Sequence, residues 1–117
     1  MVELTNPLIQ IKKGALDFCV LAIIARRETY GYEIVKFLGE QGLATSEGTI
    51  YPLLARLNKD GLVTAAWRQE DGGNPRKYYR VTAKGETALV MFKQSWLDFI
   101  EAVNCILEGG VAHGTRT

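Results

Sequence analysis

Residues 46–63, SEGTIYPLLARLNKDGLV, contain the pattern that decides the fold of this 117-residue chain. Four apolar residues recur at positions i, i+3, i+4 and i+7, which places them on one face of a helix; these are Ile50, Leu53, Leu54 and Leu57. Cap-type residues at 44–49 precede this helix and Asp60-Gly61 ends it. Proline is tolerated only near a first turn, so Pro52 leaves the start of the helix uncertain by a few residues. The outer face contains Gly48, Pro52, Ala55 and Lys59, flanked by Thr49, Tyr51 and Arg56.

Two further helices are expected before this one. Residues 8–27 contain a single helix breaker, Gly14, and are apolar nearly all round. Such a helix must be covered on more than one side, and in so small a protein we expect the extra cover to come from a second copy. Residues 32–40 form the second expected helix, which Gly42 stops. With the short connection at 42–46, the second and third helices have the proportions of a helix-turn-helix.

Two strands are expected after the third helix, at residues 62–68 and 76–81, because both segments are rich in strand-forming residues. The polar turn formers at 69–75 join them into a β-hairpin. Strand alternation places Lys77 and Tyr79 on one face of the hairpin, and Arg76 and Tyr78 on the other. The sequence leaves open which face turns toward a nucleic acid. The fold class is therefore mainly α with a small β-hairpin, a winged helix-turn-helix followed by a long C-terminal helix.

A last helix is expected from Ala83 to Glu108, with Thr82 as its N-cap. Its apolar residues step by three and four, which is a coiled-coil seam; they are Leu89, Phe92, Trp96, Phe99, Val103 and Ile106. At 1.5 Å per residue the helix is about 39 Å long. It is longer than the globule before it, so we expect it to protrude and pair with a second copy. The alternative is a seam that packs wholly inside one subunit.

Composition and charge limit the possible functions. The net charge is +1, but residues 45–85 contain seven basic and four acidic side chains, so a polyanion would bind this middle third. No apolar run reaches the roughly 18 residues of a membrane helix, and the two cysteines form no disulfide scaffold. We therefore expect a cytoplasmic protein that does not bind membranes. The single histidine, His113, lies in a glycine-rich tail, so we expect no enzyme, no metal site and no cofactor.

Five segments resemble the PadR family of transcriptional regulators: GALD (14–17), YGYEI (30–34), GTIYPLLARL (48–57), DGLV (60–63) and RKYYRVTAKG (76–85). The resemblance implies a winged helix-turn-helix repressor that is dimeric through its first and last helices. It also implies binding of double-stranded DNA at an inverted repeat, with release by a small hydrophobic effector. The single C-terminal helix is similar to that of the short subgroup of the family.

With this resemblance, the candidate DNA-binding residues are Tyr30, Thr45, Ser46, Gly48, Thr49, Tyr51, Arg56, Lys59, Asn74, Arg76 and Lys77. The N-terminal residues of the third helix would lie nearest the bases, and the basic residues would contact phosphates. The alternative for the third helix is a core helix with an inert outer face. For the hairpin, where the face that turns to DNA is left open, the alternative is that some of its basic residues are ordinary sheet surface.

In multidrug-sensing members of the family, a tryptophan on the last helix lines an apolar pore between subunits and stacks on planar drugs. Trp96 resembles that position. The candidate residues of the effector site and dimer interface are Phe18, Leu89, Phe92, Trp96, Phe99 and Val103. The expected effector is a planar aromatic small molecule. Plain dimer packing without a pore is the alternative.

These expectations divide the chain into a DNA-binding domain at 8–81, a dimerisation helix at 82–108 and a flexible tail at 109–117. Two other functions remain open. One is a winged-helix module that binds a protein partner and never meets DNA, although such a module has no need of the basic and aromatic residues at 76–80. The other is a sensor whose apolar dimer channel is its primary feature.

Overall fold

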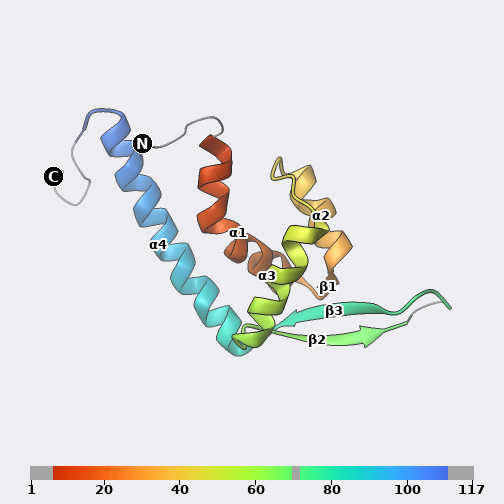
Figure 1. The fold of residues 1–117 in the computed structure, drawn as a ribbon. Helices are drawn as coiled ribbons and strands as arrows, with labels where there is room; N and C mark the ends of the chain where they lie inside the picture. The colour runs from red at the N-terminus through yellow and green to blue at the C-terminus, as the bar shows by residue number, and fades with distance from the viewer. Residues whose placement is uncertain (1–6, 70–71, 111–117) are drawn as a thin grey trace.

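The computed structural model describes the backbone of residues 7–69 and 72–110 and the side chains of residues 15–69 and 72–110. The element order is α1 (Pro7–Arg26), β1 (Thr29–Tyr30), α2 (Gly31–Glu40), α3 (Glu47–Lys59), β2 (Val63–Arg68), β3 (Arg76–Val81) and α4 (Ala83–Leu107). Figure 1 shows the β2–β3 hairpin and α4 projecting in different directions from the other helices. Most of the expected tail at 109–117, and residues 70–71 of the hairpin tip, lie outside the described residues.

Local signals set the ends of α3 and α4 as the sequence predicts. The Ser46 hydroxyl accepts a hydrogen bond from the backbone N–H of Thr49 at 3.3 Å, and Thr82 accepts one from Gly85 at 3.0 Å. Gly61 follows α3 with a φ of 78°, a left-handed conformation that glycine adopts without strain. Pro52 is the sixth residue of α3 and lies beyond its first turn, where it has no N–H to give to the Gly48 carbonyl.

The sheet has three antiparallel strands in the order β1-β3-β2. The expected hairpin is confirmed as β2–β3, and β1 is a third strand that the sequence did not predict. β1 consists of Thr29 and Tyr30, which lie opposite Tyr79 and Tyr78 of β3. β2 and β3 pair along their whole length, from Val63 opposite Val81 outward to Arg68 opposite Arg76. A two-residue segment is too short to show the alternating pattern of a strand. β1 is a strand only because it pairs with the free edge of β3.

The core lies where α1, α2, α3 and the inner ends of β2 and β3 meet. Its buried apolar side chains are Val20, Leu21, Ile24, Ile34, Leu38, Ile50, Leu53, Leu54, Leu57, Val63 and Tyr79. All four residues of the predicted inward face of α3 are among them. Tyr79 and Val63 show that one face of the sheet packs against the helices.

α4 extends beyond this core. Leu89, near its start, packs against the core, while Phe99 and Ile106 are 59% and 69% exposed. The apolar seam therefore does not pack wholly inside one subunit, and the helix protrudes as expected. The described residues span 60 × 34 × 24 Å. None of the described helices is long and apolar enough to span a membrane.

Candidate nucleic-acid interface

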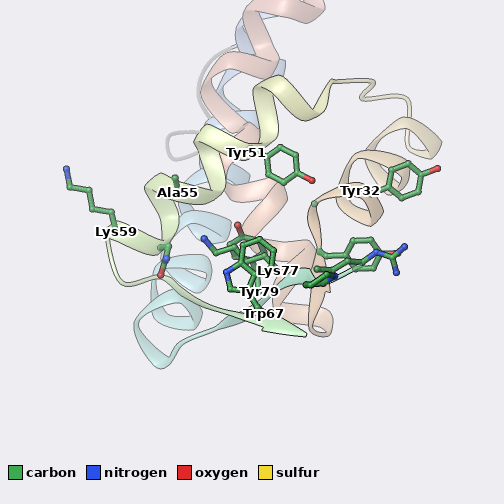
Figure 2. Close-up of a pocket in the computed structure, with 12 residues that line it drawn as sticks. Tyr32, Tyr51, Ala55, Lys59, Trp67, Lys77 and Tyr79 are labelled. Atoms are coloured by element: carbon green, nitrogen blue, oxygen red, sulfur yellow. The ribbon is translucent and has the colours of Figure 1, made fainter. Parts of the chain in front are cut away.

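A groove of about 640 Å³ runs between α3 and the β2–β3 hairpin, and the start of α2 closes one end. Its lining residues are Tyr30, Gly31, Tyr32, Tyr51, Ala55, Asn58, Lys59, Trp67, Pro75, Arg76, Lys77 and Tyr79. Five of the eleven candidate DNA-binding residues are among them: Tyr30, Tyr51, Lys59, Arg76 and Lys77. We call this feature the α3–wing groove. Figure 2 shows Trp67, Lys77 and Tyr79 close together on its hairpin side.

The charge of the α3–wing groove is of one sign. Lys59, Arg76 and Lys77 line it, and none of the described lining residues is acidic. Aromatic rings occupy much of the remaining wall, so cations and apolar surfaces alternate around the opening. Such a surface attracts a polyanion, because each cation can replace a counterion of the phosphate chain.

The N-terminal end of α3 lies beside the groove without lining it. Gly48 and Thr49 are exposed there, and Thr45 is half-buried. The Ser46 side chain caps the helix and lies 3.3 Å from the Thr49 hydroxyl oxygen. Ser46, Gly48 and Thr49 are thus exposed at the N-terminus of an α-helix, the end that lies nearest the bases in a helix-turn-helix. Asn74 is exposed near the hairpin tip.

Tyr51 joins α3 to the start of α2. Its ring packs over Gly31, where a Cβ atom would come within 2.6 Å of ring carbon Cε1. Burial raises the pKa of the Tyr51 phenol, and the Glu47 carboxylate raises it further by repelling the phenolate and accepting its hydrogen bond. The hydroxyl therefore stays protonated at neutral pH, and 45% of this residue remains exposed.

Arg56 lies away from the groove. Its Nη2 atom is 2.9 Å from both carboxylate oxygens of Asp17 on α1. The Asp17 carboxylate raises the pKa of Arg56, through the hydrogen bond first and then through its charge. In this structure Arg56 therefore links α3 to α1, and a phosphate contact requires it to leave Asp17.

The outer face of the sheet contains the remaining cations of the hairpin. Glu28 binds Arg68 at 3.0 Å and Arg80 at 3.5 Å. Arg68 also stacks on the Tyr78 ring, with its Cζ atom 3.8 Å from the ring centroid. Two arginines of this face are thus paired with one carboxylate, whereas Lys77 of the groove lies on the opposite face.

Arg76 belongs to the outer face by alternation but reaches the groove from the edge of the sheet. Its Cζ atom lies 4.7 Å from the Tyr30 ring centroid. The Tyr30 ring in turn meets Tyr78 edge to face at 5.2 Å. These contacts hold the guanidinium at the rim of the groove.

A row of aromatic rings connects α1 to α4. Phe18 stacks on Phe92 with ring centroids 4.0 Å apart, and the row continues to Trp96 at 5.8 Å and Phe99 at 6.3 Å. Leu89 packs against the core at one end of this row, and Val103 lies half-buried beyond the other. The structure therefore places the predicted effector and dimer residues along one continuous surface. Within the described part of the chain, no group of three His, Cys, Asp or Glu residues could hold a metal ion.

Comparison with known proteins identifies the family. Residues 20–90 match the family described as "Transcriptional regulator PadR-like family", and they include α2, α3, the sheet and the start of α4. The chain belongs to the PadR-like family. Its members regulate transcription, which confirms that this chain is not an enzyme.

Solved structures of PadR regulators share most of this architecture. A PadR family transcriptional regulator from Eggerthella lenta is 34% identical, with a TM-score of 0.79, covering 86% of this chain and 88% of that one. A PadR-like transcriptional regulator from Bacillus cereus is 43% identical, with a TM-score of 0.76 and coverages of 84% and 96%. Bacillus subtilis PadR in complex with operator DNA is 26% identical, with a TM-score of 0.61 and coverages of 71% and 46%.

Seven residues of the α3–wing groove in this PadR-like chain were not among the candidates: Gly31, Tyr32, Ala55, Asn58, Trp67, Pro75 and Tyr79. Trp67 and Tyr32 are large and aromatic, and both are more than half exposed. The β2–β3 register places Trp67 on the face of Lys77 and Tyr79, and this register is known only from the structure. The length of hairpin that projects past α3 could not be predicted from the sequence, because it depends on how the helices pack.

Proposed function

We propose that this chain is a homodimeric repressor that binds a near-palindromic operator in double-stranded DNA. The observation that carries the proposal is the α3–wing groove, with its cations and its lack of described acidic residues, beside the exposed N-terminal end of α3. α3 would enter the major groove and the hairpin would lie along the phosphate backbone. The operator complex of the 26% identical Bacillus subtilis PadR supports this role.

The second copy would bind along α4 and α1. Phe99, Ile106 and Leu107 of α4 are 59%, 69% and 77% exposed, which is costly for large apolar side chains in water. Pairing of two such helices would cover them and would fix two α3 helices about 34 Å apart, one turn of the duplex. Repression would follow from occlusion of the promoter by the bound dimer.

An effector would bind beside Trp96. The Phe92, Trp96 and Phe99 rings follow one another along α4 at centroid distances of 5.8 and 6.3 Å, a surface suited to a flat aromatic molecule. Asp98 is one residue from Phe99 and would favour a cationic compound. Effector binding at this position would shift the two copies relative to each other and lower the affinity of the dimer for the operator.

DNA binding is tested with duplexes selected from a random pool, compared with scrambled duplexes of the same composition. We expect tight binding to the selected duplex that weakens steeply between low and moderate salt. Arg76→Ala should weaken binding to both duplexes, whereas Thr49→Ala should reduce the discrimination between them. Equal affinity for both duplexes with the wild-type chain, or a flat response to salt, would contradict the proposal.

The effector is tested by fluorescence. Planar aromatic cations should quench Trp96 in the wild-type chain and leave the emission of Trp96→Ala, which retains Trp67, unchanged. The same compounds should weaken operator binding over the concentration range in which they quench. Quenching that is equal in both proteins would place the compound elsewhere.

A further inference from the structure

Trp67 is 67% exposed although it lies on the sheet face that forms the core. Val63 and Tyr79 occupy the same face, and they are 1% and 4% exposed. The difference comes from position along the strands. β2 and β3 extend outward past α3, so their core-facing surface continues into the open α3–wing groove, and the indole lies on that continuation.

The neighbours of Trp67 are cationic. Lys77 lies directly opposite it in the β2–β3 register, with its Nζ atom 5.8 Å from the indole centroid. Arg76 is the next residue of β3 and lines the same groove. A large flat apolar surface therefore lies beside the charge of Lys77, and Arg76 adds a second charge at the rim of the same groove. The strand of a DNA duplex has the complementary pattern, because apolar faces of deoxyribose alternate with charged phosphates along it.

We propose that Trp67 is a DNA-contact residue whose indole packs on a deoxyribose of the strand crossing the α3–wing groove, while Lys77 binds an adjoining phosphate. This inference rests on the proposed function and adds to it a contact that the sequence analysis did not include. Deoxyribose is the same in every nucleotide. Trp67 therefore contributes affinity to all duplexes and takes no part in distinguishing one sequence from another.

The first test measures the affinity of Trp67 variants for a selected duplex and for its scrambled control. Loss of the apolar contact of a large aromatic side chain weakens binding about tenfold. Trp67→Ala should show this loss equally on both duplexes, and Trp67→Phe, which keeps a ring, should lose less. Wild-type affinity in Trp67→Ala, or a loss confined to the selected duplex, would overturn the inference.

The second test uses fluorescence and does not depend on the alanine variant. The chain has two tryptophans, so Trp67→Phe leaves only Trp96. Saturating duplex should protect the wild-type emission from quenching by acrylamide and should give no protection in Trp67→Phe. Binding is followed in parallel through a label on the DNA. Binding without protection of the wild-type emission overturns this inference alone, whereas the absence of any binding by the wild-type chain overturns the proposed function.

Discussion

Two helical glycines of this chain differ in what surrounds them. A Cβ atom added to Gly85, in the first turn of α4, would collide with the Leu62 carbonyl oxygen and come within 2.9 Å of a Val81 methyl group. Gly39 in α2 has no atom within 4 Å of the same position. Alanine should therefore destabilise the protein at Gly85 and stabilise it at Gly39, even though alanine is the better helix former at both.

We expect Gly85→Ala to lower the free energy of unfolding by about 1–3 kcal/mol, which is typical of overpacking. Gly39→Ala should raise it by about 0.5–1 kcal/mol. Urea unfolding followed by circular dichroism measures both values. Equal gains at the two positions would show that α4 does not approach the β2 connection as closely as the structure indicates.

Ionisation of Tyr79 is expected to lower the free energy of unfolding at alkaline pH. Burial raises the pKa of its phenol above the ordinary value near 10, and the charge of Tyr51 adds to the effect. The folded chain therefore holds the proton more tightly than the unfolded chain. Stability from this group is complete below pH 10 and is lost as the pH rises through the folded pKa.

Tyr79→Phe keeps the buried ring and removes the titrating group. We expect the free energy of unfolding of the variant to fall less steeply above pH 10 than that of the wild-type chain. Urea unfolding at a series of pH values provides the comparison. Parallel curves for the two proteins would mean that Tyr79 titrates equally in the folded and unfolded chains.

At the scale of elements, the ion pair between Asp17 and Arg56 restrains the contact of α1 with α3. Asp17→Asn removes the carboxylate that holds Arg56 and leaves this arginine of α3 exposed and without that partner. If Arg56 then reaches a phosphate, the slope of log K against log salt steepens by about one. Fluorescence anisotropy of a labelled duplex across a salt series measures this slope.

Asp17→Asn combined with Arg56→Gln is the control for that experiment. The double variant lacks the cation, so its salt slope should not exceed that of the wild-type chain. An unchanged slope in Asp17→Asn would show that Arg56 serves only to join the two helices. The candidate list would then lose this residue.

Elements whose signals are local could be predicted from the sequence. Ser46 and Thr82 cap α3 and α4 by accepting hydrogen bonds from backbone N–H groups three residues further along the chain, and Gly61 follows the end of α3. Each of these helix boundaries therefore depends on only a few neighbouring residues. β1 could not be predicted, since its two residues become a strand only by pairing with β3. Arg56 was placed on the outer face of α3 by its spacing, but its partner is 39 residues away in the sequence.

The parts of the candidate site that belong to a single element could be predicted from the sequence. The prediction was incomplete where several elements come together. The polar N-terminal end of α3 follows from the helical period alone. The α3–wing groove requires three elements to come together, and the sequence gives no distance between them. Trp67 and Tyr32 were therefore missed, although both are exposed aromatic residues that line the groove.

At the scale of the whole molecule, the two proposed binding surfaces are separate. The α3–wing groove faces the hairpin side, while the protruding part of α4 lies on the other side of α1 and α3 (Figure 1). α4 contains 25 residues and is about 38 Å long, so most of it lies beyond the core. The two proposed surfaces therefore do not overlap, so a second copy on α4 would leave the groove open to a duplex, as the proposed dimeric regulator requires.

The seam of α4 can be tested against another apolar position on the same helix. Ile106 is in the seam and is 69% exposed, whereas Val90 is 70% exposed and is turned about 100° from its seam neighbour Leu89. Glutamate at either position adds a charge to an exposed helix residue. Only the charge at Ile106 should be buried against the second copy, where an unpaired carboxylate is strongly unfavourable.

Sedimentation velocity at micromolar concentration should therefore find Ile106→Glu as single subunits, and wild-type and Val90→Glu as dimers. Loss of the dimer also removes the link between two α3 helices, so Ile106→Glu should bind a two-site duplex no more tightly than a duplex with one half-site. Val90→Glu should keep the wild-type preference for two half-sites. Dissociation by both variants would mean that the second copy covers more of α4 than the seam, and dissociation by neither would place the dimer contact on α1.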